Sequence, residues 1–208
     1  MAKRKVTNML ALAVLSLLNE RPMHPYEIAA TMKQRGIYDV IKLTNGSLYS
    51  VVESLLKQNL IVPVETQREG KHPERTIYAP TDAGVAEFYD WLRELIDTPA
   101  KEYPRFPAAL SFIAHLSPKE TVALLEQRIA SLQMDVVRRR ASNEFAVSKG
   151  LARIFIVEQE YVVHQLEAEL AWLEAFIRDI RNGGLTELQE GERVWFFSTP
   201  DSGAGDGL

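Results

Sequence analysis

The segment LTNGSLYSVVESLLKQNLI, residues 43–61, constrains the possible fold of this chain more than any other segment. Apolar side chains recur in it at i, i+4, i+7 and i+8 from Leu48 onward, which predicts a helix with one buried face. Thr44 is a suitable N-cap, and the helix is expected to run to about Gln58. The opposite face carries short hydrogen-bonding groups where exposed helices usually carry Glu and Lys: Asn45, Ser47, Ser50 and Ser54. We therefore expect this face to meet a partner other than water.

The elements around this helix follow in an order that defines a fold. Residues 6–20 and 25–36 have the apolar periodicity of two further helices, the second with Pro25 at its first position. LIVPVETQ and TIYAP predict two short strands joined by the polar turn REGKHPER, and Thr81 then begins a fourth helix. Three helices followed by a hairpin are the order of a winged helix-turn-helix, in which the third helix enters the major groove of DNA.

The rest of the chain predicts a separate helical domain. PAKEYPRFP, with three prolines in nine residues, forms a linker, and helices are expected over residues 108–115, 117–142 and 147–182. The predicted fold class is mostly α, with an N-terminal winged helix-turn-helix that carries a small β-hairpin wing and a C-terminal α-helical dimerisation domain. The predicted boundaries are residues 1–97, 106–183, and a partly disordered tail over 184–208 in which the docking of the apolar patch RVWFF stays open.

Charge is divided unevenly along the chain. Residues 1–80 hold 11 lysines and arginines against 7 acidic residues, a net charge of +4, and the remaining residues hold 13 against 21, a net charge of −8. A basic front half favours an anionic partner there, although an excess of four charges can also arise by chance. No run of 18 apolar residues predicts a membrane span, and the absence of cysteine excludes disulfides and thiol catalysis. We expect a cytoplasmic protein that does not bind a membrane.

Residue patterns that would carry catalysis or hold a metal are absent from the sequence. His24, His72, His115 and His164 lack metal-ligand spacing, and no glycine-rich phosphate loop occurs. The glutamates between residues 158 and 174 fit a solvated helix stripe better than a pair of catalytic carboxylates. We therefore predict no enzyme, no cofactor and no metal site.

Three motifs resemble those of the PadR family of bacterial transcriptional regulators. They are HPYEIAATMKQRG, NGSLYSVVESLLKQNLI and PERTIYAPTDAG. The family pattern of the second motif is matched by Gly46, Ser47, Leu48, Tyr49, Leu55, Leu60 and Ile61. Asn59 stands where the family usually has glycine, a mild departure because Asn tolerates a left-handed backbone. In the third motif Arg75 and Tyr78 match, the two residues between them do not, and Thr81 and Gly84 keep the Thr-x-x-Gly pattern.

The resemblance covers about residues 6–95 strongly and the rest only in general plan, as in the larger PadR-like proteins with a helical C-terminal domain. It implies a DNA-binding repressor that reads a palindromic operator as a homodimer. It also implies that a small aromatic or cationic effector could release the protein from double-stranded DNA. A winged-helix module for protein interaction or DNA architecture, without a ligand switch, is the alternative.

These considerations give a set of expected DNA contacts on the third helix, the second helix, the wing and the N-terminal arm. The set is Thr44, Asn45, Ser47, Tyr49, Ser50, Lys57, Tyr26, Arg68, Lys71, His72, Arg75, Lys3, Arg4 and Lys5. The alternatives are that Tyr49 closes the edge of the core, that Asn45 or Ser47 caps the helix, and that Tyr26 packs. Solvated charge is the alternative for the basic residues of the wing.

The last helix is too long and too apolar along one stripe to be expected alone. That stripe, with its large and small side chains, is predicted to form the dimer interface: Ile154, Val157, Tyr161, Ala168, Trp172 and Ala175. Packing within one chain is the alternative, and both can hold together. An effector pocket is expected among flat apolar side chains, unless they form plain core: Trp91, Tyr103, Phe106, Phe112 and Trp172.

Overall fold

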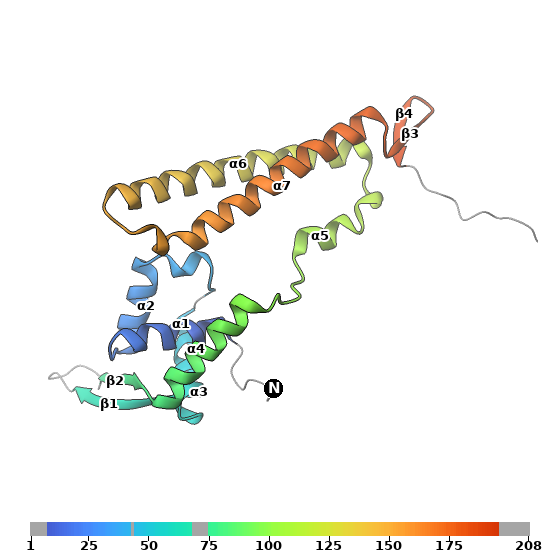
Figure 1. Ribbon diagram of the computed structural model, residues 1–208. Helices are drawn as coiled ribbons and strands as arrows, with labels where there is room; N and C mark the ends of the chain where they lie inside the picture. Colours follow the sequence, from blue (N-terminus) through green and yellow to red (C-terminus); the bar gives the residue numbers. More distant parts are fainter. Residues whose placement is uncertain (1–7, 43, 68–74, 196–208) are drawn as a thin grey trace, which may run out of the picture. The chain divides into compact units, whose positions relative to one another are not determined.

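The computed structural model describes residues 8–42, 44–67 and 75–195. The chain divides into two compact units, Met1–Glu102 and Tyr103–Leu208. The elements of the first unit are α1 (Met9–Glu20), α2 (Pro25–Gln34), a 3₁₀ turn (Ile37–Asp39), α3 (Asn45–Lys57), β1 (Ile61–Gln67), β2 (Arg75–Pro80) and α4 (Asp82–Asp97) (Figure 1). This order of elements confirms the predicted winged helix-turn-helix.

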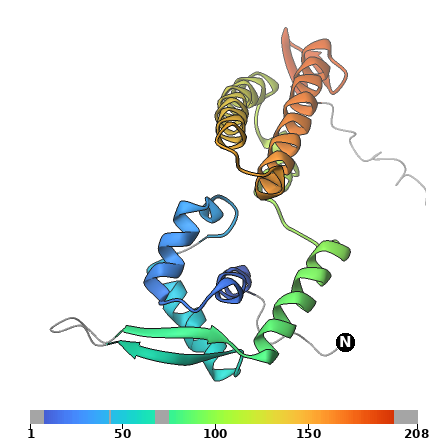
Figure 2. The ribbon, with the colours of Figure 1, turned by 60° about the vertical axis from the view of Figure 1, so that its left-hand side comes forward.

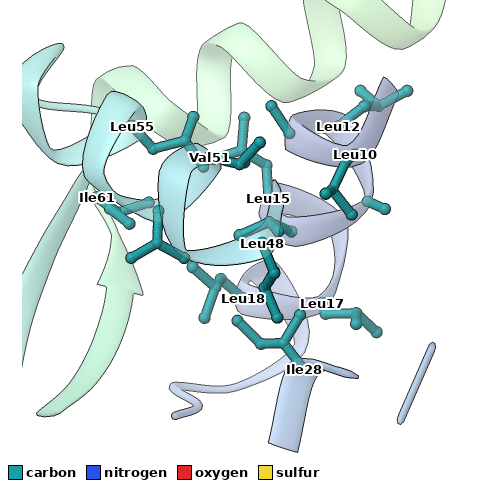
Figure 3. Close-up of a cluster of buried hydrophobic side chains, with 14 of the residues drawn as sticks. Leu10, Leu12, Leu15, Leu17, Leu18, Ile28, Leu48, Val51, Leu55 and Ile61 are labelled. Atoms are coloured by element: carbon teal, nitrogen blue, oxygen red, sulfur yellow. The ribbon is translucent and has the colours of Figure 1, made fainter. Parts of the chain in front are cut away.

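Helix α1 forms the centre of the first unit because it is apolar around its circumference. Asn8 begins the helix, and its side-chain oxygen accepts a hydrogen bond from the backbone N–H of Leu10 at 2.9 Å. The helix packs against α3, α4 and β2. Figure 3 shows its leucines clustered with Leu48, Val51 and Leu55 of α3. A helix without a polar face needs cover on every side, so α1 determines where its neighbours pack.

Helix α2 is held at both ends. At its start, Nδ1 of His24 accepts a hydrogen bond from the N–H of Tyr26 at 3.0 Å, and the carboxylate of Glu27 accepts one from the N–H of His24 at 3.1 Å. These two bonds are a capping box. Beyond its end, the guanidinium of Arg35 donates to both carboxylate oxygens of Glu20 on α1, at 2.5 and 2.7 Å. The ion pair ties the end of α2 to α1, and the helix packs against α3.

The ion pair between Glu20 and Arg35 predicts a stability difference that depends on pH. The hydrogen bond from Arg35 lowers the pKa of Glu20 from its ordinary value of 4.5. A carboxyl group with a lowered folded-state pKa stabilises the protein above its unfolded pKa, and the contribution is lost as the pH falls through the folded value. Both side chains are about half exposed, so we expect Glu20→Gln to lower the free energy of unfolding near neutral pH by about 0.5 kcal/mol.

Urea unfolding curves near neutral pH and at an acid pH below the lowered pKa of Glu20 would measure this difference, which should disappear in acid because both forms are then uncharged. The exposed Glu102 offers the control, since Glu102→Gln should leave both curves unchanged. A difference of the same size at both pH values would show that the charge of Glu20 is not its cause.

Helix α3 ends in a Schellman motif. Asn59 adopts a left-handed φ of +57° and donates its N–H to the carbonyl of Leu56 at 2.9 Å, while the N–H of Leu60 reaches the carbonyl of Leu55 at 3.0 Å. Glycine usually takes such a position, and asparagine is the common substitute. The prediction that Asn59 tolerates this backbone is confirmed.

Strands β1 and β2 form the antiparallel hairpin of the wing, which lies beneath α1 in the view of Figure 2. Ile61 pairs with Pro80 at the end of the hairpin nearest the helices. Met23, between α1 and α2, adds an isolated bridge to Tyr78, with backbone hydrogen bonds of 3.1 and 3.0 Å. The turn at residues 68–74 lies outside the described residues. The hairpin is thus bonded to the helix-turn-helix through its inner end.

The start of α4 is tied to the end of α3. The hydroxyl of Thr81 accepts a hydrogen bond from the N–H of Gly84 at 3.0 Å and donates one to the carbonyl of Asn59 at 2.8 Å. The N–H of Thr81 donates to the carbonyl of Leu60 at 3.0 Å. A Cβ built on Gly84 would lie 1.9 Å from that same carbonyl oxygen. The Thr-x-x-Gly pattern is therefore a structural junction between two helices.

The second unit consists of two long helices and several short elements. Its elements are α5 (Arg105–Leu110), a 3₁₀ turn (Ile113–His115), α6 (Pro118–Ser148), a 3₁₀ turn (Arg153–Phe155), α7 (Val157–Asn182), β3 (Thr186–Gln189) and β4 (Glu192–Trp195). Helices α6 and α7 run antiparallel side by side (Figures 1 and 2). Their core is formed by Leu125, Leu173, Ile177 and Ile180.

The boundary between the two long helices differs from the prediction. Helix α6 continues to Ser148 instead of about residue 142, and α7 begins at Val157 instead of residue 147. Gly150 is the physical reason, because its φ of +87° and the bond from the N–H of Leu151 to the carbonyl of Ala146 at 3.1 Å end α6 in a Schellman motif. The predicted placement of Ile154 on the last helix was wrong, since it lies in the 3₁₀ turn.

A short hairpin replaces part of the predicted tail. Strands β3 and β4 are joined by Glu190 and Gly191, whose φ values of +50° and +86° fit a type I′ turn. Trp195 of the RVWFF patch packs against the core of the second unit, and its Nε1–H donates to the carbonyl of Leu116 at 2.5 Å. The first part of the predicted tail is therefore ordered, and the question left open for the RVWFF patch is answered for Trp195. Residues 196–208 lie outside the described part of the chain.

Candidate nucleic-acid interface

The exposed face of α3 lies opposite its buried leucines and valines. Successive residues turn by about 100° around a helix axis, so Gly46, Ser50, Glu53 and Lys57 fall within about 30° of the centre of that face, with Tyr49 on its flank. All five residues are exposed. The face therefore presents one glycine, two hydroxyl groups, one carboxylate and one ammonium group, with little bulk between them.

The hydroxyl groups at the start of α3 form its N-terminal cap. Thr44 Oγ1 accepts a hydrogen bond from the N–H of Ser47 at 3.2 Å, and Ser47 Oγ accepts one from the N–H of Thr44 at 2.9 Å. Ser50 Oγ donates to the carbonyl of Gly46 at 3.0 Å. Capping by Ser47 is thus observed, and Ser50 is exposed. A capped helix start also presents backbone N–H groups that favour an anion.

Two tyrosines project from the helix-turn-helix. Tyr49 is 52% exposed and Tyr26, in the first turn of α2, is 75% exposed. Neither phenol hydroxyl bonds to the described residues, and neither does the ammonium group of Lys57 in the last turn of α3. These side chains are therefore not packed in the core of this unit.

The remaining predicted contacts are placed only in part. Asn45 is the first residue of α3 and Arg75 is the first residue of β2. Arg68, Lys71 and His72 of the wing turn lie outside the described residues, as does the arm with Lys3, Arg4 and Lys5. The sequence analysis left Gly46 and Glu53 out of the contact set, and the helical period measured from the buried leucines is the signal that would have included them.

The aromatic residues expected to form an effector pocket do not all gather. Phe106 and Trp172 meet edge to face, with ring centroids 6.5 Å apart, and Trp172 stacks on Phe176. Trp91 instead belongs to the core of the first unit and is 4% exposed. Phe112 is exposed and makes no ring contact with the described residues.

Charged side chains lie beside the pair formed by Phe106 and Trp172. Tyr103 and Phe112 are 82% and 67% exposed. The guanidinium of Arg128 lies 3.7 Å from the centroid of the Phe106 ring, and its Nε–H donates to Glu169 at 2.6 Å. A separate open groove of about 440 Å³ lies between α6 and α7, and none of the predicted effector residues lines it.

Helix α7 has apolar side chains on two opposite faces. Its inner face, which packs on α6, is formed by Val163, Leu173, Ile177 and Ile180. The stripe predicted for dimerisation is about 165° away on the helix, where Val157 is 51% and Tyr161 is 65% exposed. Trp172 of the same stripe is 46% exposed and also contacts the Phe106 ring. Ala168 of that stripe is exposed and Ala175 is half-buried. Ile154, 70% exposed, lies just before the helix.

Two kinds of feature are not found in the described residues. No group of three or more His, Asp or Glu side chains there is arranged to hold a metal ion. Among the helices of residues 8–195, with the gaps at 43 and 68–74, none combines the length and the apolar character needed to cross a membrane.

Comparisons with known proteins agree with this fold. PadR of Bacillus subtilis in complex with operator DNA has 20% sequence identity and a TM-score of 0.69, covering 83% of this chain and 99% of that chain. The same protein in complex with p-coumaric acid has 18% sequence identity and a TM-score of 0.69, covering 84% of this chain and 99% of that chain. The Vibrio cholerae virulence activator AphA has 15% sequence identity and a TM-score of 0.60, covering 83% of this chain and 98% of that chain. A comparison with curated proteins found no match.

The fold and the exposed face of α3 together define a winged helix-turn-helix protein with a helical C-terminal extension. Residues 14–90 match the model of the Transcriptional regulator PadR-like family, so the chain carries a PadR-like domain. The resemblance seen in the sequence motifs is confirmed. This is a family of transcriptional regulators and not of enzymes, as the sequence analysis predicted.

Proposed function

We propose that this protein is a transcriptional regulator that binds double-stranded DNA in a sequence-specific manner through the exposed face of α3. The observation that carries the proposal is the chemistry of this face, where Tyr49 and Lys57 present polar groups with no bond to the described residues and the exposed hydroxyl of Ser50 lies near them, on a helix whose other face is anchored in the core. Slim hydrogen-bonding side chains suit the edges of bases, and cations suit phosphates. The similar fold of a PadR that binds operator DNA supports the same use here.

The proposed regulator acts as a homodimer on a palindromic operator. Support comes from the open stripe on α7, because an exposed apolar stripe opposite a packed face is typical of a surface that associates. Two copies of α3 related by a two-fold axis would read two half-sites about one DNA turn, ~34 Å, apart. We propose repression as its mode, which the family resemblance implies. The fold alone does not set the mode, since a protein of similar fold is named an activator.

A small aromatic or cationic effector is proposed to release the protein from DNA. The Phe106–Trp172 pair in the second unit, with Arg128 beside it, supplies flat apolar surface and charge for such a molecule. The p-coumaric acid complex of a protein with a similar fold supports this class of ligand.

Selection from a pool of random duplex DNA tests the proposal. We expect the wild-type chain to enrich an inverted repeat, and Tyr49→Ala with Ser50→Ala to bind the enriched sequence about tenfold to thirtyfold more weakly at equal helical content. Tyr89→Ala is the matched control, because Tyr89 on α4 is 47% exposed and should leave binding unchanged.

Salt dependence is the second part of the same experiment. Contacts to phosphates make affinity fall steeply as salt rises, so the wild type should bind much more weakly at the higher of two salt concentrations. If no motif is enriched and binding is weak at both, the alternative of a winged-helix module that binds protein replaces the proposal.

A further inference from the structure

One side chain on the exposed face of α3, that of Glu53, carries a negative charge that opposes the binding of this face to DNA. Glu53 lies about 30° from the centre of that face, between Ser50 and Lys57 along the helix. It is exposed and forms no hydrogen bond or ion pair with the described residues. Lys57 stands four residues further on, the spacing at which a glutamate and a lysine usually pair, and yet the two side chains are not bonded.

A carboxylate at this position is unfavourable if the face binds DNA only through attraction between opposite charges. On a face that approaches phosphates, it loses water and meets negative charge, which weakens binding to every sequence equally. It becomes favourable where a hydrogen-bond donor of a base edge replaces the lost water. In the major groove, only cytosine N4 and adenine N6 offer amino hydrogens, whereas guanine and thymine present acceptors to the approaching carboxylate.

The neighbours of these two amino groups separate cytosine from adenine. Adenine carries the acceptor N7 beside its amino group, and this atom repels the second carboxylate oxygen. Cytosine has no acceptor at the corresponding position of its major-groove edge. A glutamate therefore selects cytosine. Glutamine pairs with adenine, because its oxygen accepts a hydrogen bond from N6 and its NH2 group donates one to N7.

We propose that Glu53 is a residue that determines specificity: it accepts a hydrogen bond from N4 of a cytosine and selects a C·G pair at one position of the bound sequence. The inference rests on the proposed function and deepens it, because it names the base that this position of α3 reads. Tyr49 and Ser50 then supply contacts that are neutral in charge, and Glu53 supplies discrimination by repelling the other three bases.

Selection from random duplex DNA with wild type, Glu53→Gln, Glu53→Ala and Asp97→Asn tests the inference. We expect the wild type to prefer cytosine about tenfold at one position, Glu53→Gln to prefer adenine there, and Glu53→Ala to show less than about a twofold preference. Asp97 is exposed at the end of α4, so Asp97→Asn removes the same charge from the first unit and should keep the wild-type motif. Circular dichroism would confirm equal folding of the four proteins.

The outcomes separate the two proposals. If the wild type enriches a motif and both Glu53 variants enrich the same motif with uniformly tighter binding, Glu53 only repels phosphates and the inference is overturned while the proposed function stands. If the wild type enriches no motif, both are overturned. A preference that changes to adenine in Glu53→Gln and is lost in Glu53→Ala supports both.

Discussion

Replacement of Gly84 by alanine is expected to lower the free energy of unfolding by about 3 kcal/mol or more. The added Cβ would lie 1.9 Å from the carbonyl oxygen of Leu60, and both groups belong to backbone, so no rotamer change relieves the overlap. That oxygen also accepts the hydrogen bond from the N–H of Thr81, so moving it breaks the junction between α3 and α4. The higher helix propensity of alanine offsets only about 1 kcal/mol of this cost.

Gly46 provides the matched control within the same unit. It lies in the first turn of α3, and a Cβ built on it meets nothing within 4 Å. Gly46→Ala should therefore leave stability unchanged or raise it by up to about 1 kcal/mol. Urea unfolding followed by circular dichroism would measure both variants. Equal stability of the two alanine variants would contradict the assigned role of the Gly84 contact.

The elements of the first unit could be predicted because each has a strong local signal at its boundary. Pro25 at a first helical position, Thr44 and Thr81 as N-caps, and Asn59 as a left-handed helix end all mark limits that depend on the nearest few residues. Such signals act locally, so the tertiary structure does not need to be known for them to be recognised.

The second unit was harder to predict because its boundaries depend on packing. A single glycine at 150, inside an otherwise helical pattern, does not distinguish a tolerated residue from a helix end until the neighbouring helix is known. The β3–β4 hairpin has two strands of four residues with mostly polar side chains, and it is anchored by Trp195 on the core of α6 and α7. This anchor joins residues far apart in sequence, which periodicity does not detect.

The exposed face of α3 was predicted in its main part, and two residues near its centre were left out of the expected contact set, which stays a prediction. Tyr49, Ser50 and Lys57 were recognised by residue type, whereas Gly46 and Glu53 are placed at the centre of the face only by the helical period. For α7, one apolar face was recognised and the other was missed, because its apolar residues lie on two faces. The periodicity identified the stripe through Tyr161 and did not show that other residues pack on α6.

Placing carboxylates on the open stripe of α7 is expected to convert a dimer into a monomer. In the variant with Val157→Glu and Tyr161→Glu, two side chains that are 51% and 65% exposed in the single chain would become charged. If the stripe is buried between two copies, each unpaired carboxylate costs several kcal/mol there, and very little in the free chain. Light scattering should show half the wild-type mass, and affinity for the enriched DNA should fall about a hundredfold or more because the second half-site is no longer tethered.

Leu188→Glu tests whether any added charge has this effect. Leu188 lies on β3, away from the stripe in sequence, and is 68% exposed, so the same chemical change there should keep both the dimer and the affinity for DNA. Equal helical content in the three proteins would show that the stripe variant is folded. A stripe variant that stays dimeric would move the interface elsewhere. A wild-type chain that is monomeric would remove the reason for an inverted repeat, because a single copy of α3 reads only one half-site.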